Sequence, residues 1–359
     1  MPYRDAWRPP RSPWPAPDVL HRLRLFLTFR PVLRALLVAL VPLAVFAIIM
    51  EFRIAAYVAG TTRVRGSDWT EFRPHPTMFW RLRPNLQVEL AMRGERFQLT
   101  TNSQGIRSPE LPFRKGTRTW RAWCLGDSIT YGYGVDDDKT YESRLQAKLQ
   151  RLHPDRQIQV LNGGCPGWTS FQARELTRSV GLKYQPDLYI LGCVYADPAY
   201  EDKPDSARVD SNPLVRWFRL ALFRSEFYLF LRQQVVRRSN PEGLPPPDYS
   251  LTTPRVPPEE YREILNWFVG QARASGGHVV FLNLGKRDPD PHPGYDQLRR
   301  IAQEVARQTG NAWVDIDAMF KERPDRANLF SDRIHPNVQG FELMAQALAQ
   351  AIEKKGWIP

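Results

Sequence analysis

Short apolar runs alternate with amphipathic segments through the last two thirds of this 359-residue chain. The apolar runs have the length of strands, and they occupy residues 120–125, 158–161, 188–194, 278–284 and 313–316. Segments with helical spacing of their apolar residues separate these runs, at residues 141–152, 171–182, 259–274, 295–309 and 338–353. Because strands that alternate with helices form parallel sheets, we expect an α/β fold whose sheet is covered by helices on both faces.

A longer apolar run lies near the amino terminus. Residues 32–50 carry one charge, Arg34, and are otherwise apolar apart from Pro42. A helix of this length reaches nearly 30 Å at a rise of about 1.5 Å per residue, roughly the thickness of the hydrocarbon core of a bilayer. We therefore predict one transmembrane helix within residues 31–57, which tolerates the proline. A buried core helix is the alternative, but apolar residues cover every face of this run and charges bracket both of its ends. A cleavable signal peptide has a shorter leader and a shorter apolar run.

The chain is basic, with 50 lysine and arginine residues against 38 acidic ones and a net charge of +12. Part of the excess lies before and at the start of the long apolar run. There the chain has seven arginines, at positions 4, 8, 11, 22, 24, 30 and 34, and only two aspartates, at positions 5 and 18. Arginine beside a membrane segment predicts its cytoplasmic side. We expect a basic cytoplasmic tail at residues 1–30, a single span of the inner membrane and a periplasmic position beyond about residue 57. No base-reading motif follows the tail, so we expect no nucleic-acid partner.

A lead-in and an insertion depart from the alternating pattern. The lead-in, residues 58–117, contains short segments that suggest strands, at 77–84, 86–90 and 97–107. The insertion, residues 198–258, has proline-rich ends and a helix-like, apolar and arginine-rich middle. Two interpretations of the insertion stay open: a lid that touches lipid or acyl chains at an anionic membrane surface, or an amphipathic hairpin packed on the core.

The first candidate for chemistry follows the apolar run at residues 120–125. Gly126, Asp127 and Ser128 come directly after it. Glycine lets the backbone turn closely, and a serine beyond the carboxyl end of a parallel strand faces the crevice where such sheets bind ligands. Ser128 is therefore a candidate nucleophile, although an ordinary strand-ending turn has the same composition. As a nucleophile, it would need a base and an orienting carboxylate.

Candidates for both partners lie about two hundred residues downstream. Asp332 and His335 are three residues apart in a segment that leads into the predicted helix at 338–353. That spacing can place both side chains on one side, so that the carboxylate holds one ring nitrogen and the other ring nitrogen faces a serine. Of the six histidines, only His335 pairs with an acid at such a spacing before a helix. The alternative is a surface turn that caps the helix.

The ordered set of motifs resembles that of the SGNH (GDSL-type) serine esterases and acyltransferases. The three blocks of the family resemble residues 126–130, 162–170 and 332–336, in the expected order. The resemblance covers about residues 95–355. It implies a three-layer, flavodoxin-like α/β/α sandwich with a central five-stranded, mostly parallel sheet, and a hydrolase domain at 118–355. The lead-in resembles that of membrane-anchored bacterial members and is expected to pack on the core.

The resemblance also implies roles for individual residues. Ser128 would be the nucleophile, His335 the base and Asp332 the carboxylate that orients it. The backbone N–H groups of Ser128 and Gly167 would form part of the oxyanion hole, with Asp127 as a further residue at the oxyanion and substrate site.

One block departs from the family pattern. The family usually carries an asparagine that donates to the oxyanion, and Ala196 stands at the matching position, followed by the retained Asp197. Loss of one such donor slows the chemistry by about a hundred- to a thousandfold. Either Tyr195 or Asn162 supplies the missing donor, or the enzyme is slow, or the site has been turned to binding.

The expected function is a serine esterase, acyl hydrolase or O-acyltransferase that acts on a glycan- or lipid-linked acyl ester outside the cytoplasmic membrane. The alternative is a degenerate module of the same fold that binds polysaccharide or a partner in the envelope. The sequence contains no metal-binding or nucleotide-binding motif, so no metal or other cofactor is expected. Three cysteines do not suggest a disulfide framework. The pattern leaves the acyl group, the choice between hydrolysis and transfer, and the oligomeric state open.

Overall fold

The computed structural model describes residues 19–60, 63–64, 71–92, 95–193, 195–239, 252–287 and 293–359. The chain divides into two compact units, Met1–Ala55 and Ala56–Pro359. Residues 1–18, which hold most of the expected basic tail, lie outside the described residues. The described strands all belong to the second unit.

Helix α1, Val19–Gly60, supplies all the described residues of the first unit and ends in the second. Within it, Val38–Tyr57 is long and apolar enough to cross a membrane, by length and composition. This stretch begins later than the apolar run at 32–50 and lies inside the predicted range 31–57. A signal sequence would satisfy the same criterion of length and composition. Helix α1 is therefore a candidate for a membrane anchor or for a signal sequence.

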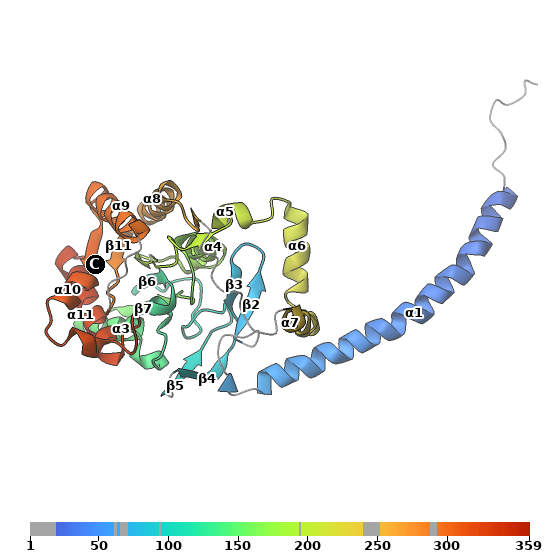
Figure 1. Ribbon diagram of the computed structural model, residues 1–359, viewed down its shortest axis with the longest axis horizontal. Coiled ribbons are helices and arrows are strands. Elements are labelled where there is room, and N and C mark those ends of the chain that lie inside the picture. Colours follow the sequence, from blue (N-terminus) through green and yellow to red (C-terminus); the bar gives the residue numbers. More distant parts are fainter. Residues whose placement is uncertain are drawn as a thin grey trace, which may run out of the picture. The chain divides into compact units, whose positions relative to one another are not determined.

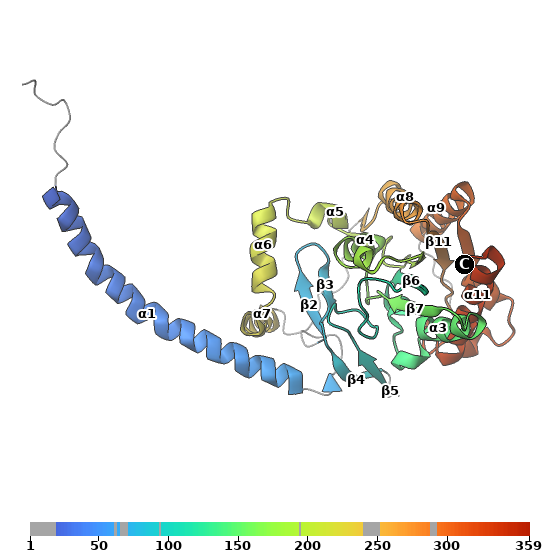
Figure 2. The same cartoon turned by 180° about the vertical axis from the view of Figure 1, so that it is seen from behind.

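A five-stranded parallel sheet forms the centre of the second unit (Figures 1 and 2). Its strands are β6 (Thr119–Gly126), β7 (Gln157–Asn162), β8 (Leu188–Gly192), β11 (His278–Asn283) and β12 (Ala312–Asp315). They lie in the order β12-β11-β8-β6-β7, and every neighbouring pair is parallel. The predicted five-stranded parallel sheet is confirmed, and each strand overlaps its apolar run in the sequence.

Helices cover both faces of this sheet. They are α3 (Tyr141–Leu152), α4 (Ser170–Ser179), α8 (Pro258–Ala274), α9 (Pro293–Thr309), α10 (Ile316–Lys321) and α11 (Val338–Lys355). Alternate residues of β6 point to opposite faces, so Trp123 and Leu125 join one hydrophobic cluster while Ala122 and Cys124 join the other. The first cluster includes side chains of α4, α8 and α9, and the second includes side chains of α3, α10 and α11. The predicted three-layer arrangement is therefore confirmed.

The lead-in folds into two small sheets. Strands β2 (Phe72–His75) and β3 (Phe79–Leu82) form an antiparallel hairpin, and β1 (Arg63–Val64), β4 (Gln87–Met92) and β5 (Glu95–Thr100) form a three-stranded sheet. Leu82, Leu90 and Phe97 share one hydrophobic cluster with Trp123 of the central sheet. The lead-in thus packs on the α/β core. Strand β2 was not expected, because its sequence has no alternation of apolar and polar residues.

The insertion contains several short elements. They are β9 (Tyr200–Glu201), α5 (Asp205–Arg208), α6 (Pro213–Leu222), α7 (Glu226–Ser239) and β10 (Thr253–Pro254), while residues 240–251 lie outside the described part. Helix α7 packs on the domain through buried Leu229 and through Glu226, whose carboxylate accepts from Arg83 at 2.6 Å. None of the residues of α6 is buried. The packed-hairpin interpretation therefore fits α7, whereas α6 is at most half-buried, at Arg216, Leu220 and Leu222.

Candidate active site

Ser128 lies at a sharp turn between β6 and the short helix α2, Ser128–Tyr131. The turn requires glycine at position 126, because a Cβ there would lie 2.1 Å from the Thr130 Oγ1 atom. Asp127 caps the helix, and its Oδ1 atom accepts from the backbone N–H of Ile129 at 2.9 Å. The local sequence thus places the serine at the carboxyl edge of the central sheet.

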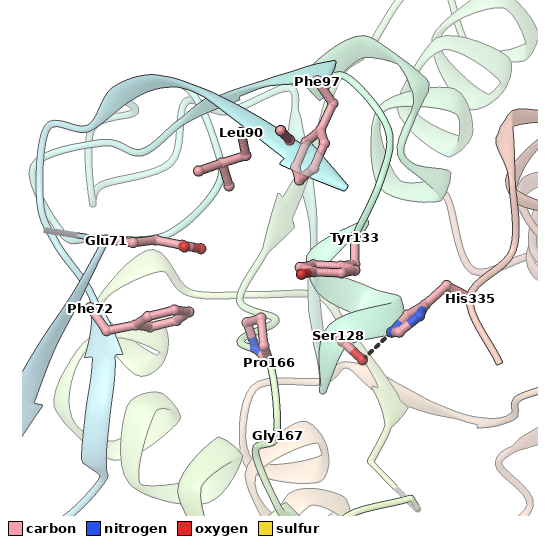
Figure 3. Close-up of a pocket in the computed structure, with 10 residues that line it drawn as sticks. Glu71, Phe72, Leu90, Phe97, Ser128, Tyr133, Pro166, Gly167 and His335 are labelled. Carbon is pink, nitrogen blue, oxygen red and sulfur yellow. Dashed lines mark hydrogen bonds between the residues drawn. The ribbon is translucent and has the colours of Figure 1, made fainter. Parts of the chain in front are cut away.

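The structure brings Ser128, His335 and Asp332 together. The Ser128 Oγ atom lies 2.8 Å from His335 Nε2, and His335 Nδ1 lies 2.7 Å from Asp332 Oδ2 (Figure 3 shows the first contact). The other carboxylate oxygen of Asp332 accepts from the backbone N–H groups of Ile334 and His335, both at 2.8 Å. The carboxylate therefore holds both the loop and the ring, and the free ring nitrogen faces the serine.

The charge of Asp332 is favoured at this position. Burial alone would raise the pKa of its carboxyl, but hydrogen bonds from the His335 backbone, the His335 ring and the Ile334 backbone outweigh burial and lower the pKa. The His335 ring also packs against Tyr133, with 5.1 Å between ring centroids. Such an arrangement can move a proton from the serine hydroxyl to the imidazole while the carboxylate stabilises the imidazolium.

A pocket opens above this trio. Its cavity volume is about 300 Å³. In Figure 3, Ser128 and His335 lie in the lower part of the lining, and Leu90 and Phe97 of the lead-in form an apolar wall in the upper part. The complete lining consists of Glu71, Phe72, Leu90, Ala91, Phe97, Ser128, Tyr133, Pro166, Gly167 and His335. A mostly apolar cavity with a few polar groups is typical of a small-molecule site.

A family model described as the GDSL-like Lipase/Acylhydrolase family matches residues 124–343. The chain belongs to this family. The resemblance in its sequence motifs is therefore confirmed, and the protein is a member of a family of ester hydrolases. A search of curated proteins found no match.

Several solved structures are distantly similar to this GDSL-family chain. A lipase/acylhydrolase from Enterococcus faecalis is 16% identical with a TM-score of 0.44, and the match covers 66% of this chain and 96% of that one. A mutant of Axe2, an acetyl xylan esterase from Geobacillus stearothermophilus, is 18% identical with a TM-score of 0.41, covering 65% and 94%. TesA is 17% identical with a TM-score of 0.42, covering 65% and 98%. Likeness at this distance transfers no substrate to this chain.

The side chains of Asn162 and Tyr195, the two candidates for the missing oxyanion donor of the GDSL family, form their hydrogen bonds elsewhere. Asn162 donates through Nδ2 to the Thr130 carbonyl at 2.6 Å, and its oxygen accepts from the Gly164 N–H at 2.9 Å. The Tyr195 hydroxyl donates to the Leu284 carbonyl at 2.8 Å. Neither residue lines the pocket at Ser128. These contacts disfavour the alternative in which Asn162 or Tyr195 supplies the missing oxyanion donor.

Asp127 and Asp197 act on the site through the backbone. Asp127 is buried, and burial raises its pKa to about 6. Its Oδ1 atom caps α2, and the residue does not line the pocket. Asp197 is fully buried and accepts from the Ser170 N–H at 3.0 Å at the start of α4, while burial raises its pKa to about 7. These contacts fit positioning of α2 and α4 rather than contact with a substrate.

The loop around Gly167 is held by residues that the motifs did not indicate. Gly167 has a φ of +72°, which favours glycine, and its carbonyl accepts from Arg255 Nη1 at 2.8 Å. Trp80 Nε1 donates to the Pro166 carbonyl at 3.0 Å, and Trp168 Nε1 donates to the Trp80 carbonyl at 3.0 Å. The lead-in and the end of the insertion therefore fix the loop in which Pro166 and Gly167 line the pocket beside Ser128.

Within the described part of the chain, no group of three or more His, Cys, Asp or Glu side chains could hold a metal ion. The cysteines Cys124, Cys165 and Cys193 are free and buried. Burial raises the pKa of the Cys165 thiol well above its ordinary value, which disfavours the reactive thiolate. Cys165 is therefore a packing residue beside the glycine block.

Proposed function

We propose that this GDSL-family protein is a serine esterase or O-acyltransferase that works through an acyl-enzyme. The observation that carries the proposal is the continuous hydrogen-bonded chain from Ser128 Oγ through His335 to Asp332, at 2.8 and 2.7 Å, at the base of an open pocket. Ser128 is the nucleophile, His335 the general base and Asp332 the group that orients the ring.

In the first half of the reaction, Ser128 Oγ attacks the ester carbonyl and its proton passes to His335 Nε2. The tetrahedral oxyanion accepts hydrogen bonds from the backbone N–H groups of Ser128 and Gly167. The carbon–oxygen bond to the leaving alcohol then breaks, and the imidazolium returns the proton to that alcohol. In the second half, His335 takes a proton from water or from an acceptor hydroxyl, which attacks the acyl-serine and releases Ser128.

Water and a hydroxyl acceptor follow the same chemistry, so the proposal covers both hydrolysis and transfer. We place the substrate, an acyl ester on a glycan or lipid, outside the cytoplasmic membrane. The support is the candidate span Val38–Tyr57 together with the arginine excess before it. The proposed organisation is a cytoplasmic tail at 1–30, a membrane helix at 31–57, a lead-in at 58–117 and a hydrolase domain at 118–355 with the insertion 198–258.

A second candidate is a degenerate module that binds polysaccharide or an envelope partner. Ala196 favours it, because neither Asn162 nor Tyr195 offers its donor to the site. Each oxyanion donor accounts for roughly 3–4 kcal/mol of transition-state stabilisation. A site that keeps two backbone donors and lacks the third therefore loses one such contribution and retains the other two. We favour the enzyme because the nucleophile, base and carboxylate keep their hydrogen bonds.

Labelling of the full chain with a fluorophosphonate separates the two candidates. The active enzyme labels on Ser128, and Ser128→Ala abolishes labelling without changing thermal unfolding. Ser179→Ala, at an exposed serine in the last turn of α4, provides a matched control, since it leaves Ser128, the imidazole and their supports in place. If the wild-type chain resists the probe and hydrolyses no p-nitrophenyl ester, the proposed chemistry fails and the binding module is supported.

A further inference from the structure

Helix α6 turns apolar side chains away from the protein. Leu214, Trp217 and Phe218 are 74%, 69% and 59% exposed, and Ala221 is exposed as well. Their spacing of i, i+3, i+4 and i+7 places all four on one side of the helix. These residues form what we call the α6 face. Figures 1 and 2 show α6 at the periphery of the domain, joined to it through α5 and α7.

The α6 face is held in place by polar contacts and by its neighbours in the chain. The Asn212 side chain caps the helix by accepting from the Leu214 N–H at 2.9 Å. Arg216 donates to the Asp210 carbonyl at 2.6 Å. A helix of ten residues is marginal in water when no apolar side of it is packed. An exposed apolar face with polar surroundings marks an interaction site, so we expect the α6 face to bind a partner surface.

The charges of helices α6 and α7 are mostly positive. Residues 213–239 contain six arginines and a single acid, Glu226. Glu226 is buried and pairs with Arg73 and Arg83 of the lead-in, so it offers no negative charge to a partner. The exposed charged residues of this part are arginines, at 219, 224, 232 and 238, and one of them, Arg219, pairs with Asp210 at 3.6 Å. A partner that complements this surface is therefore anionic.

We infer that the α6 face docks on an anionic phospholipid surface. Trp217 and Phe218 enter the boundary between headgroups and acyl chains, and the neighbouring arginines bind lipid phosphates. A helix with tryptophan, phenylalanine and leucine on one side and arginines beside them has the composition of interfacial helices. Basic residues near an anionic membrane surface strengthen binding to it.

Other features of the chain favour lipid over a second copy. A twofold contact through the α6 face would bring together two copies of the same arginine-rich segment, whose net positive charges repel. The chain also carries the candidate span Val38–Tyr57 five residues before strand β1. The inference concerns the surface to which the protein binds and not the chemistry at Ser128. It can therefore be tested independently of the proposed function.

A single-site label tests the docking in the full chain. The native cysteines are buried, so Ala221→Cys on α6 and Ala274→Cys on α8 can each be labelled with an environment-sensitive fluorophore. Both native alanines are exposed and lie in the last turns of their helices, which makes position 274 a matched control. Each labelled protein is placed in nanodiscs of phosphatidylcholine, with or without phosphatidylglycerol, that contain doxyl-labelled lipid.

We expect quenching at position 221 to exceed that at position 274 by about threefold or more in anionic nanodiscs, and to weaken in neutral ones. Adding Trp217→Ser and Phe218→Ser should reduce quenching at position 221 to the level of position 274, without lowering the unfolding temperature, because both side chains are exposed. Equal quenching at the two sites, or equal quenching at position 221 in neutral and anionic nanodiscs, would overturn the inference. The inference would also be overturned if the label at position 221 became shielded from water as the protein concentration rises while the doxyl lipid did not quench it. That result would identify a second copy of the chain as the occupant of the α6 face.

Discussion

The guanidinium of Arg255 donates a hydrogen bond of 2.8 Å to the carbonyl oxygen of Gly167. The same group binds buried Asp205 through two nitrogens, at 3.2 and 2.9 Å, and the Gln172 side chain at 2.8 Å. Arg255 lies at the end of the insertion and Gly167 lies in the glycine block. The contact therefore ties the insertion to the loop that we assign to the oxyanion.

Arg255→Lys should lower kcat of ester hydrolysis by about tenfold and leave KM within about twofold. The single ammonium group of lysine cannot make the hydrogen bonds that the guanidinium makes to Gly167, Asp205 and Gln172 at the same time. Lysine retains the positive charge beside Asp205, so the buried carboxylate stays paired and the fold persists. Steady-state kinetics on a p-nitrophenyl ester check this prediction. Arg262→Lys is the matched control, because Arg262 on α8 forms a half-buried ion pair with Glu304 on α9, away from the site. A change in KM alone would argue against a role in aligning Gly167.

Asp332→Asn tests the orienting carboxylate. An asparagine can still accept from the Ile334 and His335 backbone N–H groups, so the loop should keep its shape. The neutral side chain no longer stabilises an imidazolium, and kcat should fall by about a hundred- to ten-thousandfold. Kinetics together with thermal unfolding check the variant. A loss of stability that matches the loss of activity would instead mark Asp332 as a purely structural cap.

The fold could be predicted because its signals are local. Each strand of the central sheet is an apolar run, and Ser128, Asp332 and His335 lie in short motifs whose order in the chain is recognisable. Donor roles could not be predicted in the same way. Asn162 and Tyr195 have suitable side chains, but only their partners, the Thr130 and Leu284 carbonyls, decide where their donors point.

The supports of the site were not visible in the sequence because they reach it through long-range packing. Trp80 lies 86 positions before Pro166, to which it donates, and no motif links the two. Glu71 lines the pocket and accepts from the Tyr131 hydroxyl at 2.7 Å, across 60 positions of the chain. The helical pattern of α6 was recognisable, but periodicity alone does not tell whether an apolar face turns inward or outward.

The pocket wall supplied by the lead-in should select substrates by size. Ala91 is exposed at the pocket and belongs to β4, so Ala91→Phe fills the cavity without disturbing the core. We expect kcat/KM for p-nitrophenyl hexanoate to fall by about tenfold or more, because lost space for a few methylenes has an effect of this size. The acetate ester should change by less than about twofold. Ala274→Phe on α8 is the control, and an equal loss for both esters would contradict selection by this wall.

Glu142 should make stability depend on pH. Its side chain is buried, and burial raises its pKa from 4.5 to about 8. Since the folded pKa exceeds the unfolded one, the folded state holds the proton more tightly, and stability decreases as pH rises from about 4.5 to about 8, by roughly 5 kcal/mol at most. Glu142→Gln removes this charge, so its free energy of unfolding should exceed that of the wild type at pH values above the folded pKa, and the advantage should vanish at pH values below the unfolded pKa. Denaturant unfolding across this range measures the difference, with Glu342→Gln, an exposed glutamate paired with Lys148, as the control. A constant difference at every pH would show that Glu142 does not titrate in this window.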